Sequence, residues 1–152
     1  MTVGTAGNPA GIPGFPDAVA SLAGAGDMEE FARLQWRAFE PALHEPLEVL
    51  TQDVLGATTW LVRDSGRLVG SVRCEVHGEF AHLSLVMVEP DLQGRGVGRW
   101  LVGHAEEMAP PQVTAYQLFT AAGNVAFYAG LGYVAEGERE TLSSVVRMGK
   151  DR

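Results

Sequence analysis

The sequence predicts a single α/β domain, in which a mixed sheet carries helices on both faces. Three observations support this fold class. Residues 58–88 hold three strand-like segments joined by short turns, as in consecutive antiparallel strands. The β-forming run from Leu83 to Val88 leads into a glycine-rich loop and then a helix-spaced apolar pattern, which is a unit typical of α/β folds. The 152 residues suffice for one domain with its own core.

The composition is that of a globular protein, with 46% hydrophobic and 20% charged residues. No apolar run is long enough to predict a membrane span, and no basic, apolar signal segment opens the sequence. Cys74 is the one cysteine, which excludes a disulfide framework and favours a cytoplasmic location. The net charge of −8 argues against nucleic-acid binding, which needs clustered Lys and Arg. This charge is compatible with a cationic acceptor such as an amine.

The N-terminal part is expected to begin with a tail. Residues 1–16 are rich in Gly, Pro and Ala with little to bury, so we interpret them as a flexible tail. No internal repeat or second domain is visible, and residues 17–152 are interpreted as one domain. A weak first strand is expected over residues 19–25.

Two helices should follow this strand. Asp27 is a good N-cap with two glutamates after it, and the helix it begins should end before Pro41. The segment 46–55 has an apolar side at helical spacing, and Gly56 closes it.

The next segments are strands. Residues 58–63 are β-forming, Asp64-Ser65-Gly66 is a turn, and residues 68–77 alternate as a long strand. Gly78 and Glu79 then turn the chain into a central strand that begins near Phe80.

The C-terminal part alternates between helices and strands. Apolar residues recur at helical spacing from Trp100 to Met108, and the prolines at 110 and 111 stop this helix. A strand over 113–120 and a short helix over 124–130 follow. A final hairpin is expected to pair 133–138 with 143–148.

The glycine loop is the strongest indication of a ligand. Gly94, Gly96 and Gly98 lie just before a helix, whose free backbone N–H groups and dipole favour an anion such as phosphate. The loop lacks the Gly-Lys-Ser/Thr ending of a P-loop, and Leu101 stands where a dinucleotide fingerprint has its third glycine. A structural loop without a ligand is the alternative.

Residues 88–99, VEPDLQGRGVGR, resemble the acetyl-CoA-binding motif of the GNAT superfamily of N-acetyltransferases, Arg/Gln-x-x-Gly-x-Gly/Ala, at Gln93, Gly96 and Gly98. Residues 124–133, NVAFYAGLGY, resemble the Asn…Tyr-x-x-x-Gly-Phe/Tyr motif that follows in many members. The resemblance implies the GNAT fold, whose element order agrees with the one above. It also implies transfer of an acetyl group from acetyl-CoA to a primary amine of a small molecule or a peptide.

The resemblance also implies the cofactor site. The glycine loop and its flanking arginines would hold the pyrophosphate, and the central strand would splay from its neighbour to expose backbone groups to the pantetheine arm. A backbone N–H near Val88 would polarise the thioester carbonyl. A fully paired core strand is the alternative. The implied acetyl-CoA-binding residues are Val86, Met87, Val88, Gln93, Gly94, Arg95, Gly96, Gly98, Arg99, Asn124 and Tyr128.

The catalytic residues implied are Tyr128 and His82. Tyr128 would protonate the leaving thiolate, or else it is a core tyrosine. Asn124 would bind pantetheine or only cap the helix. Strand alternation predicts His82, Ser84, Val86 and Val88 on one face, with His82 as the base that deprotonates the amine. Glu75, His77 and Glu79 are alternative bases, and an enzyme with no dedicated base is a further alternative.

Two other functions remain open. One is a non-catalytic acyl-CoA-binding regulatory domain of the same fold, and the other is a nucleotide-binding domain. His77 and His82 have no further donor at a recognised metal-ligand spacing, so no metal is predicted. The segment from Trp36 to Glu45 covers the acceptor site in similar proteins. Homodimers are common among these proteins, and the C-terminal hairpin is the candidate interface.

Overall fold

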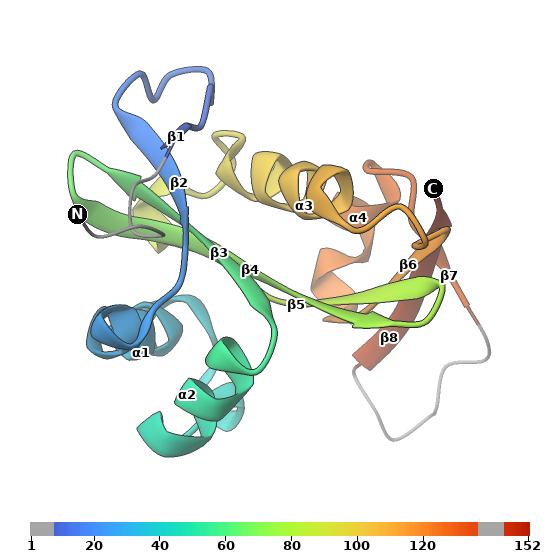
Figure 1. Cartoon of the computed structure of the whole chain (residues 1–152), viewed down its shortest axis with the longest axis horizontal. Coiled ribbons are helices and arrows are strands. Elements are labelled where there is room, and N and C mark those ends of the chain that lie inside the picture. The colour runs from blue at the N-terminus through green and yellow to red at the C-terminus, as the bar shows by residue number, and fades with distance from the viewer. Residues whose placement is uncertain (1–7, 137–144) are drawn as a thin grey trace.

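The computed structural model describes residues 8–136 and 145–152, and this part of the chain forms one eight-stranded sheet with helices on both faces. The mixed α/β class is therefore confirmed. Figure 1 shows α1 and α2 on one face and α3 and α4 on the other. The strands are β1 (Asn8–Pro9), β2 (Ala18–Leu22), β3 (Thr58–Asp64), β4 (Arg67–His77), β5 (Phe80–Val88), β6 (Ala115–Ala121), β7 (Val134–Ala135) and β8 (Val145–Asp151). The helices are α1 (Met28–Ala38), α2 (Leu47–Leu55), α3 (Val97–Met108) and α4 (Val125–Ala129).

The strand order is β1-β2-β3-β4-β5-β6-β8-β7. Strands β1 to β5 pair antiparallel in sequence order. Strand β6 pairs parallel with β5, because α3 carries the chain back across the sheet between them. Strand β8 then pairs antiparallel with both β6 and β7. The predicted final hairpin is therefore present as β7 and β8, although its connection, 137–144, lies outside the described residues.

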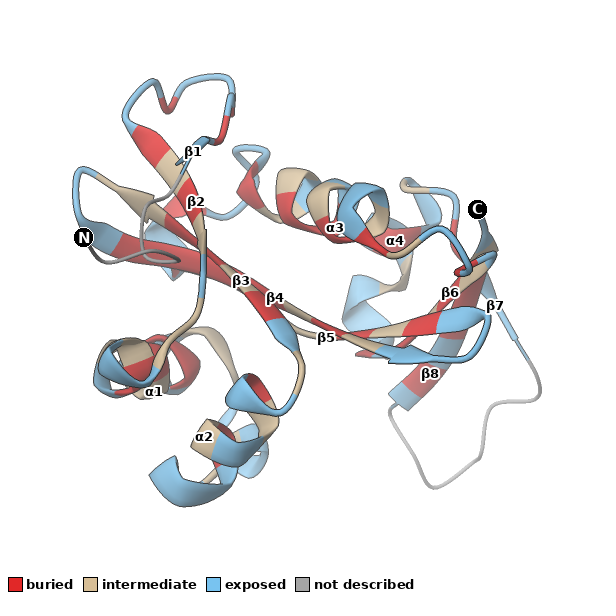
Figure 2. Ribbon diagram, in the orientation of Figure 1, coloured by how far each residue is buried: buried red, intermediate tan, exposed pale blue. Residues whose placement is uncertain are grey.

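Each face of the sheet has its own apolar cluster. One cluster joins the sheet to α3 and includes Leu83, Leu101 and Val102. The other joins it to α1 and α2 and includes Phe31, Leu50 and Met87. Figure 2 shows the buried residues along the strands and on the helix sides that face them. The cluster in which a β5 side chain lies therefore shows which face it occupies.

The N-terminal segment corrects the prediction of a flexible tail over 1–16. Strand β1 pairs with β2, and Ala10, Ile12 and Phe15 are 7%, 3% and 5% exposed within the α3-side cluster. These few apolar side chains cover the end of the sheet, so the packed part of the chain begins before Asp17. Residues 1–7 lie outside the described residues.

Strand β5 contains a bulge that reverses its faces. Leu85 has a φ of +49°, and the pairing with β4 shifts between Ser71 and Arg73. Such a φ is rare for a residue other than glycine. The buried hydroxyl of Ser71 donates a hydrogen bond of 2.8 Å to the Leu85 carbonyl oxygen, which holds the bulge.

The bulge makes the expected alternation along β5 wrong. Before it, Ala81 and Leu83 pack on the α3 side, so His82 and Ser84 face α1 and α2. After it, Val86 and Val88 pack on the α3 side and Met87 on the α1 side. His82 therefore lies on the opposite face from Val86 and Val88.

Candidate active site

The glycine loop has the backbone that the sequence predicts. Gly94 and Gly96 have φ values of +78° and +95°, and a Cβ atom at either would meet nothing within 4 Å. Their conformation requires glycine, while the space beside them is open. Gly98 is different, because a Cβ there would lie 3.3 Å from the Phe127 ring and 3.5 Å from a methyl group of Val88. Gly98 thus allows α4 and the end of β5 to approach the loop.

The loop presents free N–H groups at the start of α3. Gly96 is the N-cap residue and no side chain caps the helix. The first hydrogen bond across this turn runs from the Trp100 N–H to the Gly96 carbonyl oxygen, 3.0 Å away. The N–H groups of Val97, Gly98 and Arg99 are left for an external acceptor, at the end of the helix where the dipole favours an anion.

Two arginines flank this helix end. Arg95 and Arg99 are exposed and help to line an open cleft of about 520 Å³ along α3. Within the described residues neither forms an ion pair, and the Arg95 guanidinium lies 4.7 Å above the Phe15 ring. Both arginines are therefore available to bind phosphate.

The central strand separates from its neighbour, as the resemblance implies. Pairing between β5 and β6 ends at Leu83 and Leu118, although β5 continues to Val88. The Glu89 N–H donates to the Val69 carbonyl oxygen on β4, so by alternation the N–H groups of Val86 and Val88 point away from β4, toward the opening. Met87 does not reach this opening, because its side chain is 1% exposed in the α1-side core.

Gln93 and Asn124 lie near the opening and make different contacts. The Gln93 side-chain amide donates a hydrogen bond of 3.1 Å to the Val88 carbonyl oxygen, which fixes the loop to the strand end. Asn124 is exposed and its side chain makes no capping bond to α4. Asn124 is thus the N-cap residue of α4 without a capping bond from its side chain, and its predicted role toward pantetheine stays a prediction.

Tyr128 lies on α4 and is 7% exposed. Its ring packs edge-on against Phe127, 4.9 Å between centroids, and Phe127 in turn lies beside Gly98. Burial raises the pKa of Tyr128 to about 12, and among the described residues its hydroxyl group has no hydrogen-bond partner. The phenol therefore stays protonated at all ordinary pH values and can donate to a ligand.

His82 lies one residue before the pairing of β5 and β6 ends. Burial, followed by the positive charge of Arg73, lowers its pKa, so the neutral imidazole is favoured. Glu75 forms an ion pair with Arg73, 2.6 Å from Oε2 to Nη2, and a second contact with His77. Arg73 is the main cause that lowers the pKa of Glu75, which makes its carboxylate a weaker base than His82.

A buried ion pair connects α1 to the end of β5. Glu89 is 2% exposed. The Arg37 guanidinium donates hydrogen bonds to its carboxylate, with Nε 2.8 Å from Oε1 and 3.1 Å from Oε2. Arg67 lies 3.5 Å from the same carboxylate. The residue between Val88 and the glycine loop is thus held by two cations.

The sequence did not reveal the polar residues of the α1–α2 side. Gln35 is 1% exposed on α1, and its Oε1 accepts a hydrogen bond of 3.0 Å from the Glu45 N–H. Burial raises the pKa of the Glu45 carboxyl group, and the nearby Asp53 raises it further. A glutamine on the apolar side of α1 was the available signal, but its partner is ten residues away in an irregular segment.

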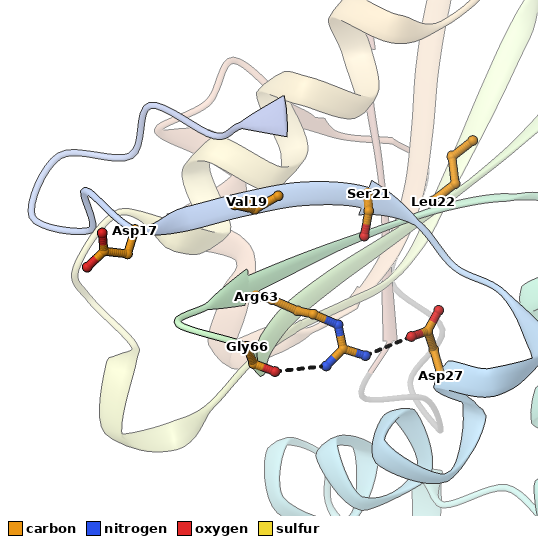
Figure 3. A pocket seen from close by; sticks show the side chains of 7 residues that line it. All are labelled: Asp17, Val19, Ser21, Leu22, Asp27, Arg63 and Gly66. Atoms are coloured by element: carbon orange, nitrogen blue, oxygen red, sulfur yellow. Dashed lines mark hydrogen bonds and ion pairs between the residues drawn. The ribbon is translucent and has the colours of Figure 1, made fainter. Parts of the chain in front are cut away.

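The structure has a second cavity, of about 240 Å³, between β2, the β3–β4 turn and the start of α1. Figure 3 shows the Arg63 guanidinium between Asp27 and the Gly66 carbonyl oxygen. Glu30 completes the partners of Arg63. The charge of Arg63 is therefore already paired, and its ion pairs join β3 to the start of α1.

The residues present fit a coenzyme A thioester. The helix end has three free N–H groups and two unpaired arginines for a pyrophosphate, and the opening beside β5 has two outward N–H groups for an extended arm.

No group of three potential metal ligands occurs in residues 8–136 and 145–152. No helix there is long and apolar enough to cross a membrane.

A profile of the acetyltransferase (GNAT) family matches residues 28–133, which are more than half of the chain. The chain therefore belongs to this family, and membership supports acyl transfer as its class of reaction. None of the curated proteins matches the sequence closely enough to count as a relative.

Many solved structures share the fold. The PaiA N-acetyltransferase of Thermoplasma acidophilum, in complex with coenzyme A, is 16% identical with a TM-score of 0.75 over 89% of this chain and 99% of its own. The ribosomal-protein-S18-alanine N-acetyltransferase of Escherichia coli is 19% identical with a TM-score of 0.72, over 88% and 93%. The N-acetylglutamate synthase of Neisseria gonorrhoeae, complexed with coenzyme A and N-acetyl-glutamate, is 16% identical with a TM-score of 0.73, over 88% and 35%.

Proposed function

We propose that the protein is an N-acetyltransferase that moves an acetyl group from acetyl-CoA to a primary amine. The observation that carries this proposal is the opening between β5 and β6 beside an uncapped helix N-terminus. The N–H groups and arginines of the loop would hold the pyrophosphate, and the backbone of Val86 and Val88 would align the pantetheine arm. Acetyl-CoA supplies the activated acetyl group as a thioester when it is bound.

Because of the bulge in β5, His82 and Tyr128 lie on opposite sides of the sheet, so we assign a different proton transfer to each side. His82 faces α1 and α2, so we assign it the proton that the amine loses on that side. Tyr128 belongs to α4 on the opposite side, and we assign its hydroxyl group the proton that the leaving thiolate gains. The Val88 N–H, which points toward the opening, would donate a hydrogen bond to the thioester carbonyl oxygen.

The lowered pKa of His82 supports its role, because the ring is neutral and can accept a proton at neutral pH. The raised pKa of Tyr128 supports the complementary role, because this phenol keeps its proton until it is needed. The acceptor would enter between the sheet and the segment that joins α1 to α2. Cationic amines suit a protein with a net charge of −8.

The first test is a thermal-shift series with acetyl-CoA, coenzyme A, NAD and ATP. A ligand at about 100 times its Kd adds about 2.7 kcal/mol, which should raise Tm by roughly 5–10 °C in a domain of this size. We expect shifts with acetyl-CoA and coenzyme A alone. A shift with NAD or ATP instead would favour a nucleotide-binding domain and would overturn the proposal.

A second measurement separates an enzyme from a regulatory domain of the same fold. Release of free thiol from acetyl-CoA is followed with a panel of primary amines. We expect release that depends on the amine. Tight binding of acetyl-CoA without release for any amine would identify a non-catalytic acyl-CoA-binding domain.

A further inference from the structure

Three buried polar side-chain atoms of the described residues have no hydrogen-bond partner: Gln35 Nε2, Glu45 Oε2 and His104 Nε2. The His104 ring stacks on Trp100 and meets the edge of Trp60, each 4.5 Å between centroids, so packing accounts for its position. The other two atoms belong to neighbouring groups, since Gln35 Oε1 accepts from the Glu45 N–H. An unpaired donor atom and an unpaired acceptor atom thus belong to two residues that are hydrogen-bonded to each other, and such buried atoms are costly unless a ligand or a water molecule pairs them.

These two residues lie on the acceptor side of the proposed reaction. Helix α1 packs against β4 and β5. The charge of Arg73 acts on the Glu45 carboxyl group, and Arg73 Nη1 lies 3.4 Å from Ser84 Oγ, directly before the bulge. His82 faces the same side. The pair therefore lies beside the face from which we expect an amine to approach the opening.

The chemistry of the pair selects one kind of partner. Gln35 Nε2 donates hydrogen bonds, so it needs an oxygen. Glu45 Oε2 accepts them, so it needs an N–H or O–H group. A carboxamide or peptide group offers both at once. A carboxylate would add a further negative charge beside the hydrogen-bonded carboxyl groups of Glu45 and Asp53, and a hydrocarbon would leave both atoms unpaired.

We propose that Gln35 and Glu45 form a subsite for a carboxamide or peptide group on the acceptor, at a distance from its reacting amine. This proposal rests on the proposed function and narrows its acceptor class to amino-amides and peptide amines. Glu45 belongs to the segment that joins α1 to α2, and the turn of this segment, Pro41–Leu43, buries none of its residues.

The test compares four acceptors of equal length with wild-type protein: 4-aminobutanamide, 4-aminobutanoate, pentylamine and 1,4-diaminobutane. Their reacting amines are alike, and only the distal group differs. Two hydrogen bonds to the amide should give 4-aminobutanamide at least about a 10-fold higher kcat/KM than pentylamine. 4-Aminobutanoate should be the poorest acceptor. The difference should lie in KM, because the subsite binds the part of the acceptor that does not react.

Isosteric variants then assign the effect to the two residues. Gln35→Glu keeps the oxygen that accepts the Glu45 N–H and removes the donor. Glu45→Gln replaces the ionisable carboxyl group by a neutral amide with almost no change of shape. Each should bring the amide and the alkylamine within about 3-fold of each other, and Glu45→Gln should also raise kcat/KM for 4-aminobutanoate. Glu48→Gln, on the exposed side of α2, is the matched control and should change nothing.

The results that would overturn the subsite differ from the results that would overturn the proposed function. If wild-type protein binds acetyl-CoA and acetylates all four amines equally, the acetyltransferase stands and the subsite is wrong. A clear preference for 1,4-diaminobutane would also overturn it, because Glu45 would then bind a second ammonium group. If wild-type protein neither binds acetyl-CoA nor releases thiol, the proposed function itself has failed.

Discussion

Replacement of Tyr128 by phenylalanine tests the assignment of the proton donor. The hydroxyl group has no partner in the described part of the protein, while the ring packs against Phe127 and Tyr133. Tyr128→Phe therefore keeps the packing and leaves no group unpaired. We expect the free energy of unfolding to change by less than about 0.5 kcal/mol and the Kd for acetyl-CoA to stay within about 2-fold of wild type.

The pKa of about 12 sets the size of the effect on turnover. A thiol has a pKa of about 8.5, so complete transfer of the proton from this phenol to a free thiolate is uphill by about 5 kcal/mol. The proton must therefore move while the carbon–sulfur bond breaks. Loss of a general acid of this kind lowers kcat by about 10²–10⁴-fold, which is about 3–5 kcal/mol of activation free energy.

The assay measures thiol release at saturating acetyl-CoA and amine, together with Kd from calorimetry. Tyr133→Phe is the control, because the Tyr133 hydroxyl donates a 2.7 Å hydrogen bond to Glu106. This control should lose about 1.5–3 kcal/mol of stability and keep its turnover. Wild-type kcat in Tyr128→Phe would refute the reasoning, and so would a fall in turnover that follows a fall in stability.

Three further predictions concern the loop, the base and the bulge. Gly96→Glu places a carboxylate at the phosphate site and should weaken acetyl-CoA binding at least about 100-fold by calorimetry, whereas Gly96→Ala, which adds only strain at φ +95°, should weaken it far less. Burial lowers the pKa of His82, so the fall of kcat at acidic pH, measured at saturating amine, should have its midpoint below pH 6.5, about the ordinary histidine value. If His82→Gln shows the same fall of kcat at acidic pH as wild type, His82 is not the base. Ser71→Ala unpairs the Leu85 carbonyl oxygen and should cost about 1–3 kcal/mol in urea unfolding, with weaker acetyl-CoA binding; unchanged binding would mean that the bulge forms without the hydroxyl.

The glycine loop shows how far sequence reasoning could go. The three glycines predict a turn that only glycine can adopt and a helix that starts beside it, and the structure has this turn at Gly94 and Gly96 and the helix from Val97. The order of strands and helices was also predictable, because each segment carries its own periodicity and turn residues. The family followed from two short motifs, and the match over residues 28–133 confirms it.

The faces of β5 could not be predicted. Alternation assumes an unbroken ladder, and Leu85 gives no local sign that it adopts a positive φ. The bulge is accompanied by a hydrogen bond from the Ser71 hydroxyl on the neighbouring strand, which the sequence around Leu85 does not reveal. The packing of residues 8–16 was missed for a related reason, because Ile12 and Phe15 are too few to form a periodic pattern. In both cases the deciding contact lies far away along the chain.

The ion pair between Arg37 and Glu89 has a consequence for protein engineering. It anchors the last turn of α1 to the strand end that leads into the glycine loop. On the other side, the Arg73 guanidinium donates to the Asp53 carbonyl oxygen and anchors α2 to β4. The segment between these anchors is therefore a candidate for exchange: under the proposed function, grafting residues 39–46 from another member of the family should change which acceptors are used and leave the proposed donor site as it is.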